Sequence, residues 1–126
     1  PLAPLGEDLA VARARWEANG PASYRYDYRD VCYCAVRHLR ITVTDGVVSD
    51  AEWLGDPPPF EQGPQGFTID DLFDRLATGL AEGPADADIL FDATLGYPVQ
   101  ARVDPIENAE DEEWGFVVES LVAITQ

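Results

Sequence analysis

The sequence predicts an α+β domain in which an antiparallel sheet of about six strands carries two helices on one face. Two features favour this class: two stretches space their apolar residues as amphipathic helices do, and six stretches alternate or cluster as strands do. Most of the strands follow one another through short turns, so the order α-β-β-β-α-β-β-β indicates hairpins and a largely antiparallel sheet. The length of 126 residues is typical of one domain. We therefore expect a flexible tail over 1–6 and a single domain over 7–126.

The first half of the chain predicts one helix followed by three strands. Acidic residues start the helix, which suits the helix dipole, and Gly20-Pro21 ends it. The first strand alternates tyrosines with charged residues, as a half-buried strand does, and Asp45-Gly46 suits a tight turn between the other two. The expected elements of this half are a helix over 7–19 and strands over 23–33, 38–44 and 47–54.

The second half predicts another helix and three more strands, after a loop over 55–66 that is rich in proline and glycine. Thr68 and Asp71 have the spacing of a capping box, and Gly83-Pro84 ends the helix. The last strand is apolar on both faces, so we expect it in the middle of the sheet. The expected elements of this half are a helix over 68–81 and strands over 87–93, 97–104 and 114–124.

The charge of the chain excludes several classes of partner. Twenty-four acidic residues stand against eight arginines, and the net charge of −16 argues against nucleic acid and anionic membranes. No stretch approaches the roughly 20 apolar residues of a membrane span. The acidic excess suits either halophilic adaptation or an acidic binding surface. Because methionine is absent, Pro1 is not a translation start, and we expect a removed signal peptide or a trimmed chain.

Few residues suit catalysis near neutral pH, so we expect no enzyme and assign no catalytic residue. His38 is the single histidine. The chain lacks a Gly-x-Ser-x-Gly nucleophile elbow, and the segment from Gly63 to Gly66 lacks the lysine and the hydroxyl residue of a phosphate-binding loop. With 24 carboxylates, some pair will fall at a glycosidase-like separation by chance, so such a pair carries no weight.

Cys32 and Cys34 form a Cys-x-Cys pair at the end of the first expected strand. Residues i and i+2 of a strand share a face, with Cα atoms roughly 6.5–7 Å apart, at the edge of the disulfide range. A small disulfide staple, or two buried small residues, is one interpretation, and a redox pair is another. Two thiolates and His38 would also provide three ligands for a metal ion.

A run of carboxylates follows the strand that ends at 104. Ca²⁺ takes such oxygen ligands without strict geometry, although the Asp-x-Asp-x-Asp-Gly calcium motif is absent. A solvated acidic loop and a docking face for a basic partner are the alternatives. The candidate calcium ligands are Asp104, Glu107, Asp111 and Glu113.

Tyrosines form a candidate binding surface, because this side chain offers a large contact area at a low cost in entropy. Tyr24, Tyr26 and Tyr28 share one face of the first strand, and Tyr97 joins them as a candidate. The alternative is a core face covered by the two helices, in which each hydroxyl needs a hydrogen-bond partner. Tyr97, between Gly96 and Pro98, also suits the hairpin between two strands.

Several short motifs stand in a fixed order between about residues 16 and 120. They are Ser23-Tyr24-Arg25-Tyr26, Cys32-Tyr33-Cys34, Asp45-Gly46, Thr68–Phe73, Phe91-Asp92, Leu95-Gly96-Tyr97-Pro98 and Asp111-Glu112-Glu113. Together they resemble a domain-of-unknown-function family of small bacterial secreted proteins and lipoproteins, with Phe91 where tyrosine is expected. The resemblance implies an extracytoplasmic protein after signal removal, often with a lipid anchor, which here would lie upstream of Pro1. It implies no known activity.

These observations predict an exported, non-enzymatic domain that binds a protein or a small ligand through its exposed sheet face or its loops. One alternative is a thiol-dependent redox or metal-binding protein that uses Cys32 and Cys34, and an exported location favours the oxidised pair. The other alternative is an acidic surface domain stabilised by Ca²⁺. The first interpretation requires no cofactor.

Overall fold

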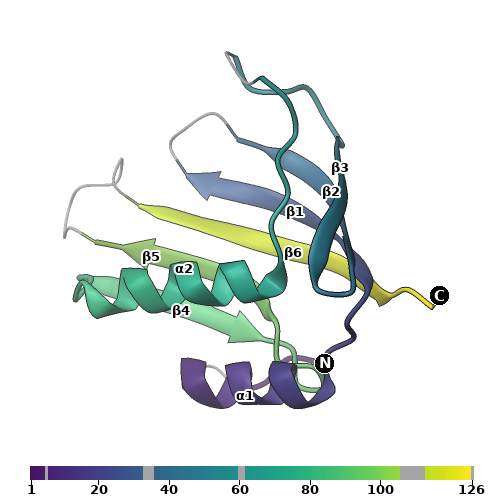
Figure 1. The fold of residues 1–126 in the computed structure, drawn as a ribbon. Helices are drawn as coiled ribbons and strands as arrows, with labels where there is room; N and C mark the ends of the chain where they lie inside the picture. The colour runs from purple at the N-terminus through teal and green to yellow at the C-terminus, as the bar shows by residue number, and fades with distance from the viewer. Residues whose placement is uncertain (5, 33–35, 60–61, 106–112, 126) are drawn as a thin grey trace.

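Two helices lie on one face of a six-stranded antiparallel sheet (Figure 1). The computed structural model describes residues 1–4, 6–32, 36–59, 62–105 and 113–125. The elements are α1 (Leu9–Asn19), β1 (Tyr24–Cys32), β2 (His38–Thr44), β3 (Val47–Trp53), α2 (Ile69–Ala81), β4 (Asp86–Phe91), β5 (Pro98–Asp104) and β6 (Trp114–Ala123). The predicted α+β class and the predicted order of the elements are confirmed.

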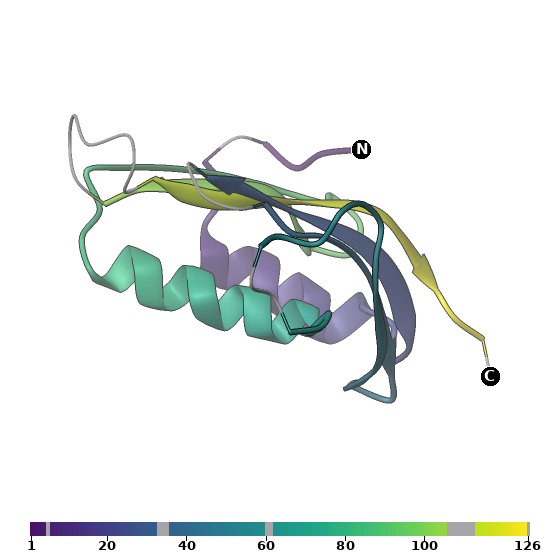
Figure 2. The ribbon, with the colours of Figure 1, turned by 90° about the horizontal axis from the view of Figure 1, so that it is seen from above.

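The strand order is β3-β2-β1-β6-β5-β4, so two three-stranded meanders meet where β1 pairs with β6. β6 lies between β1 and β5, which confirms the central position predicted from its two apolar faces. Figure 2 shows both helices on the same side of the sheet, and no helix of the described ranges covers the other side. Each strand therefore has one face toward the helices and one face toward the surroundings.

Side chains cap the first turn of both helices. Asp8 has an extended backbone and accepts a hydrogen bond from the Ala10 N–H at 2.8 Å, so α1 begins two residues later than predicted. The predicted capping box of α2 is present. The Thr68 hydroxyl accepts from the Asp71 N–H at 3.0 Å, and the Asp71 carboxylate accepts from the Thr68 N–H at 2.9 Å.

The tyrosines of β1 form the centre of the core. Tyr24, Tyr26 and Tyr28 face the helices and are at most 2% exposed. The Tyr24 hydroxyl accepts a hydrogen bond from the Ile69 N–H at 2.8 Å, and burial raises the pKa of Tyr24 to about 12. The Tyr26 hydroxyl donates to the Phe67 carbonyl. The interpretation of these three tyrosines as an open binding surface is therefore wrong, because the helices cover the rings and nearby groups satisfy the hydroxyls.

The segment around Gly96 is a tight turn on which α1 rests. The Asp92 carboxylate accepts hydrogen bonds from two backbone N–H groups of this turn, at 3.0 and 2.7 Å. Gly96 has a φ of +90°, and a Cβ at this position would lie 2.3 Å from the Ala12 carbonyl oxygen. Tyr97 is half-buried, with its ring centroid 6.2 Å from that of Trp16. Tyr97 therefore packs against α1 in the region of this turn.

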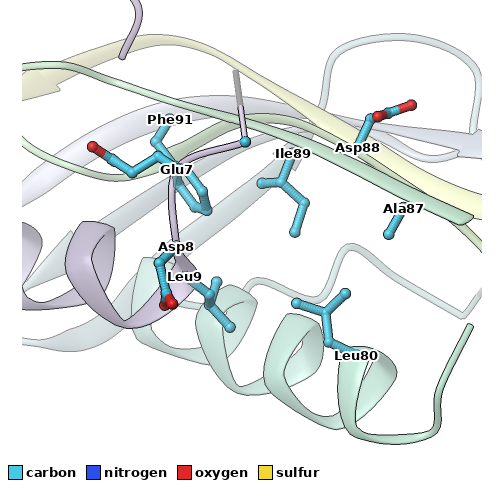
Figure 3. Close-up of a pocket in the computed structure, with 9 residues that line it drawn as sticks. Glu7, Asp8, Leu9, Leu80, Ala87, Asp88, Ile89 and Phe91 are labelled. Atoms are coloured by element: carbon cyan, nitrogen blue, oxygen red, sulfur yellow. The ribbon is translucent and has the colours of Figure 1, made fainter. Parts of the chain in front are cut away.

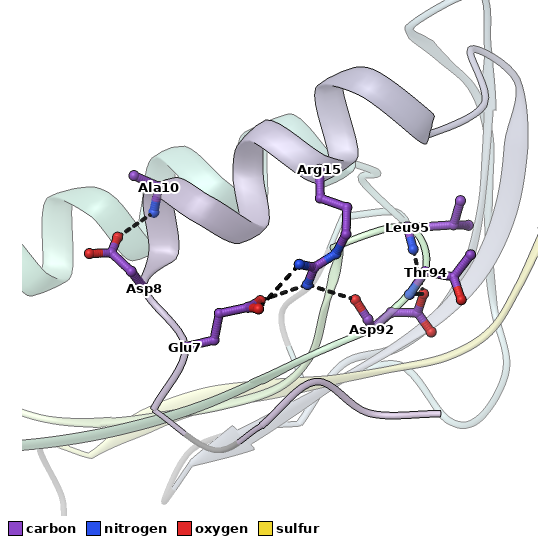
Figure 4. A network of polar contacts seen from close by, with 7 residues as sticks. All are labelled: Glu7, Asp8, Ala10, Arg15, Asp92, Thr94 and Leu95. Carbon is purple, nitrogen blue, oxygen red and sulfur yellow. Dashed lines mark hydrogen bonds and ion pairs between the residues drawn. The ribbon is translucent and has the colours of Figure 1, made fainter.

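Arg15 fastens α1 to the same turn (Figure 4). Its Nη2 and Nη1 donate to the two oxygens of Glu7 at 2.6 and 3.1 Å, and Nη2 also donates to the Asp92 carbonyl at 3.0 Å. The side chains of Arg15 and Glu7 are 21% and 16% exposed, so the pair is largely withdrawn from solvent. The hydrogen bonds to Glu7 raise the pKa of Arg15, whose guanidinium stays charged and compensated.

Candidate functional site

The pairing of the arginines distinguishes one part of the surface. All eight arginines belong to the described residues, and six of them lie within 4.0 Å of a described carboxylate oxygen. The six are Arg13, Arg15, Arg29, Arg37, Arg40 and Arg102. Among the residues that the structure describes, no carboxylate lies within this distance of Arg25 or Arg75. With 24 acidic residues in the chain, an arginine without one beside it requires a reason.

Aromatic groups hold Arg75 in place of an acid. Arg75 lies on the exposed side of α2, with its Cζ atom 4.5 Å from the centroid of the Trp114 ring. Its Nη1 donates to the Tyr28 hydroxyl at 3.0 Å. Gly79 leaves room for the indole, because a Cβ there would lie 2.6 Å from an indole carbon of Trp114. The guanidinium is thus positioned by neutral groups, and these do not compensate its charge.

Arg37 lies over the ring of Tyr28 and has its charge balanced by Asp30. Its Nε and Nη2 donate to the two oxygens of Asp30 at 2.7 and 3.0 Å. Asp30 is 7% exposed and also accepts from the Tyr28 hydroxyl at 2.6 Å. Burial alone would raise the pKa of Asp30, but the hydrogen bonds from Arg37 and Tyr28 outweigh burial and hold this pKa below its ordinary value.

Two hollows flank Arg75. The first has a volume of about 300 Å³ and is lined by Arg37, Phe67, Asp71, Leu72 and Arg75. The second has a volume of about 360 Å³ and is lined by Asp74, Arg75, Thr78, Gly79, Glu82 and Trp114. We call the group formed by Arg37, Phe67, Arg75 and Trp114 the α2 arginine site. Tyr28 lies beneath it, with its ring centroid 4.5 Å from that of Phe67.

Two of the acids that border the site are engaged with other groups. Asp71 accepts the Thr68 N–H in the capping box of α2 at 2.9 Å. Asp74 accepts a hydrogen bond from Arg13 of α1 at 2.7 Å. Asp71 therefore keeps a negative charge at the border, whereas Arg13 balances the charge of Asp74, and the centre holds one net positive charge, that of Arg75.

A third hollow, of about 370 Å³, lies between the start of α1, the end of α2 and β4 (Figure 3). Figure 3 shows Leu80 and Ile89 converging on this space, while the carboxylate of Asp88 points away from it. Glu7 and Asp88 are each paired with an arginine, at 2.6 and 2.5 Å. This hollow presents mainly apolar side chains to a ligand, so we place the candidate site at the α2 arginine site instead.

Of the predicted calcium ligands, Asp104 and Glu113 both adjoin the pair formed by Val103 and Trp114, at one end of the β5–β6 ladder, and Glu107 and Asp111 lie outside the described residues. Glu113 accepts a hydrogen bond from Arg102 at 3.1 Å, and Arg102 also pairs with two aspartates of β4 at 2.8 and 2.5 Å. Asp104 ends β5, and its buried Oδ1 has no hydrogen-bond partner in the part of the chain that the structure describes. In the described ranges no three His, Cys, Asp or Glu residues are placed to hold a metal ion.

The predicted cysteine pair lies at the end of β1. Cys32 is the last residue of this strand and faces Trp114 of β6 in the register of the sheet. Cys34 lies outside the described residues, so the disulfide, redox and metal interpretations all stay predictions. His38, the other candidate ligand, begins β2 opposite Arg29. The register places Cys32 at the same end of the sheet as the α2 arginine site.

Sequence reasoning assigned none of Arg37, Phe67 and Arg75 to a site. One signal was available, because Arg75 is the only basic residue of a helix whose first turn holds two aspartates. The remaining signals are not local. Phe67 belongs to the loop before α2, and Trp114 comes close to Arg75 only through the pairing of β6 with β1.

A family model described as "Family of unknown function (DUF6174)" matches residues 8–123. The chain belongs to the DUF6174 family. The match runs from the N-cap of α1 to the last residue of β6, so the α2 arginine site lies within the DUF6174 domain. Neither curated proteins nor solved structures gave a match. Among the described residues, no helix has the length and apolar character needed to cross a membrane.

Proposed function

We propose that this DUF6174 domain is an exported, non-enzymatic binding domain that holds a small organic anion at the α2 arginine site. The observation that carries the proposal is Arg75, a guanidinium with aromatic contacts and no carboxylate within 4.0 Å among the described residues. Export is supported by the resemblance of the sequence motifs to secreted proteins and lipoproteins.

The chemistry of the site favours an anion. A guanidinium carries five N–H donors, and Tyr28 accepts from one of its nitrogens, so donors remain for a ligand. A bound carboxylate would supply the negative charge that the described acids do not place beside Arg75. The hollows on both sides of the guanidinium give a ligand room to approach.

The same residues favour binding over catalysis. The two hollows beside Arg75 have no histidine or cysteine among their described lining residues. Burial raises the pKa of the Tyr28 hydroxyl to about 12, so this group stays protonated near neutral pH. The site therefore offers charge and shape, without a group that exchanges protons at physiological pH.

The test is a ligand-observed NMR screen of small organic acids, each paired with its neutral amide, against the wild type, Arg75→Met and Arg25→Met. Arg25→Met is the matched control, because Arg25 also has no described carboxylate within 4.0 Å but lies in β1 among the residues that face away from the helices. We expect acids, but not their amides, to bind the wild type and Arg25→Met and to lose binding in Arg75→Met. Acids that bind Arg75→Met as well as the wild type, or a screen without any acid-specific binder, would refute the proposal.

A second candidate function is calcium binding at the end of β5. The observation that favours it is the buried Oδ1 of Asp104, which has no hydrogen-bond partner among the described residues and could instead coordinate a cation. If the domain binds Ca²⁺ there, 1 mM CaCl₂ should raise the melting temperature of the wild type, because a ligand of the folded state stabilises it. Asp104→Asn should abolish the shift. An unchanged wild-type melting temperature would remove this candidate.

A further inference from the structure

We infer that the ligand of the α2 arginine site is a monocarboxylate carried on a flat aromatic ring. The inference rests on the proposed function and specifies the chemical class of its ligand. Three features of the site lead to it: one net positive charge, a negative border, and an aromatic side chain on each side of Arg75.

The charge balance selects a single negative charge. Asp30 neutralises Arg37 through two hydrogen bonds, at 2.7 and 3.0 Å, so Arg75 alone contributes net charge at the centre. Asp71 borders one hollow and Glu82 borders the other, where Asp74 is paired with Arg13. A carboxylate matches the charge of Arg75, whereas a phosphate dianion would bring a second negative charge toward these acids.

The walls of the site select a flat apolar body. Phe67 and Leu72 line the hollow on one side of Arg75, and the indole of Trp114 lines the hollow on the other. Tyr28 supports Phe67 edge-on, with planes at 82°, and Gly79 leaves space for the indole, so both walls are positioned from beneath. Aromatic rings prefer such offset or edge-on partners.

The volume of the site limits the size of the ligand. The two hollows measure about 300 and 360 Å³, at the lower end of the roughly 300–1,000 Å³ that ligand pockets span. A ligand with one or two rings suits this volume.

The experiment uses sodium benzoate as the probe and the ¹H–¹⁵N spectrum of the tryptophan indoles as the readout. We expect benzoate to shift the indole signal of Trp114 and to leave those of Trp16 and Trp53 in place. Benzamide tests the charge, phenyl phosphate tests the preference for a monoanion, and cyclohexanecarboxylate tests the flat ring. Each of these compounds should bind more weakly than benzoate, and Arg75→Met should weaken benzoate by about tenfold or more, because a charge-assisted bidentate pair is lost.

Two variants keep the result interpretable. Arg75→Lys keeps the charge but loses the bidentate geometry, so it should bind benzoate with an affinity between those of the wild type and Arg75→Met. Arg25→Met should bind benzoate as the wild type does. If cyclohexanecarboxylate binds through Arg75 as tightly as benzoate, the preference for a flat ring is wrong. If phenyl phosphate does so, the preference for a single negative charge is wrong. In both cases the proposed function stands. If benzoate binds Arg75→Met unchanged, or if the Trp114 signal stays in place, the inference is wrong, and the wider screen of acids then decides the proposed function separately.

Discussion

Arg15 and Arg75 project from the two helices of the domain, and their surroundings differ. Arg15 of α1 donates hydrogen bonds to the Glu7 carboxylate at 2.6 and 3.1 Å and to the Asp92 carbonyl at 3.0 Å. Arg75 of α2 meets a phenol at 3.0 Å and an indole ring at 4.5 Å. An arginine whose charge is balanced by an acid therefore holds parts of the fold together. Where aromatic groups position an arginine without neutralising its charge, it keeps the capacity to bind a ligand.

The comparison also explains why the two clusters differ in their effect on folding. The Arg15 cluster joins the start of α1 to the turn at Asp92, far along the chain, so its contacts hold the tertiary structure together. Arg75 contacts residues that already have other partners. The Tyr28 hydroxyl, for example, donates a hydrogen bond to Asp30 whether or not Arg75 is present. Losses in the first cluster should reduce stability, and losses in the second should reduce binding.

The largest effect is expected from Gly96→Val, which disturbs the turn beneath the Arg15 cluster. Gly96 has a φ of +90°, and its Cβ would meet the Ala12 carbonyl at 2.3 Å. The positive φ and the overpacking together should cost about 3 kcal/mol of unfolding free energy, measured by urea denaturation.

The matched control is Gly46→Val, at a φ of +79° with no atom within 4 Å of the Cβ. Gly46→Val should lose only the unfolding free energy that the positive φ costs a residue with a side chain, about 1–2 kcal/mol. Equal losses in the two variants would contradict the close packing of α1 on the turn.

Asp30→Asn should have the next largest effect, because it leaves the Arg37 guanidinium beside a neutral amide. Asp30 is 7% exposed but the Arg37 side chain is 31% exposed, so solvent reduces the cost to about 2 kcal/mol at pH 7. The folded pKa of Asp30 lies below the ordinary value of about 3.9, so its stabilising contribution is present above that pH and is lost as the pH falls through the folded pKa.

The measurement is urea denaturation of the wild type and Asp30→Asn at a series of pH values from 7 to 2. The difference between the two proteins should be constant above about pH 5 and should shrink on acidification. Asp27→Asn serves as the comparison, because its partner Arg40 is 40% exposed and its loss should cost less. A difference between the wild type and Asp30→Asn that grows below pH 4 would contradict the assigned role of the Asp30 carboxylate.

Arg15→Met tests how much the hydrogen bonds of Arg15 to Glu7 and Asp92 stabilise the fold. It leaves the Glu7 carboxylate, 16% exposed, without its partner and removes a donor from the Asp92 carbonyl. The expected loss is about 1.5 kcal/mol, below that of a fully buried pair because both side chains keep some exposure. A double-mutant cycle with Glu7→Gln measures the coupling directly, and additive single losses would show that the pair does not act as a unit.

The fold was predictable from the sequence where local rules decide it. The capping box at Thr68 and Asp71 set the start of α2, and the alternation of the tyrosines set the phase of β1. Alternation showed which tyrosines share a face, but not that the helices cover that face, so burial had to come from the packing. The α2 arginine site was not predictable, because it joins a loop, a helix and a strand through the pairing of β1 with β6.

The smallest effect on stability is expected from Arg75→Met, and this makes it the sharpest test of the comparison. The variant loses an exposed contact with the Trp114 ring and a hydrogen bond to the Tyr28 hydroxyl, which keeps its bond to Asp30. The cost should be about 0.5 kcal/mol or less by urea denaturation, as for other exposed cation–aromatic contacts. Arg25→Met removes the same charge elsewhere and should match it.

If Arg75 served mainly to stabilise the fold, Arg75→Met would lower the free energy of unfolding as much as Arg15→Met does. Removing a positive charge from a chain with a net charge of −16 adds some repulsion in either variant, and comparison with Arg25→Met subtracts that common term. What remains is the local contribution of Arg75. If that contribution to stability is near zero while Arg75→Met loses the binding of organic acids, the aromatic contacts of Arg75 serve to bind a ligand, because they add nothing to the free energy of unfolding.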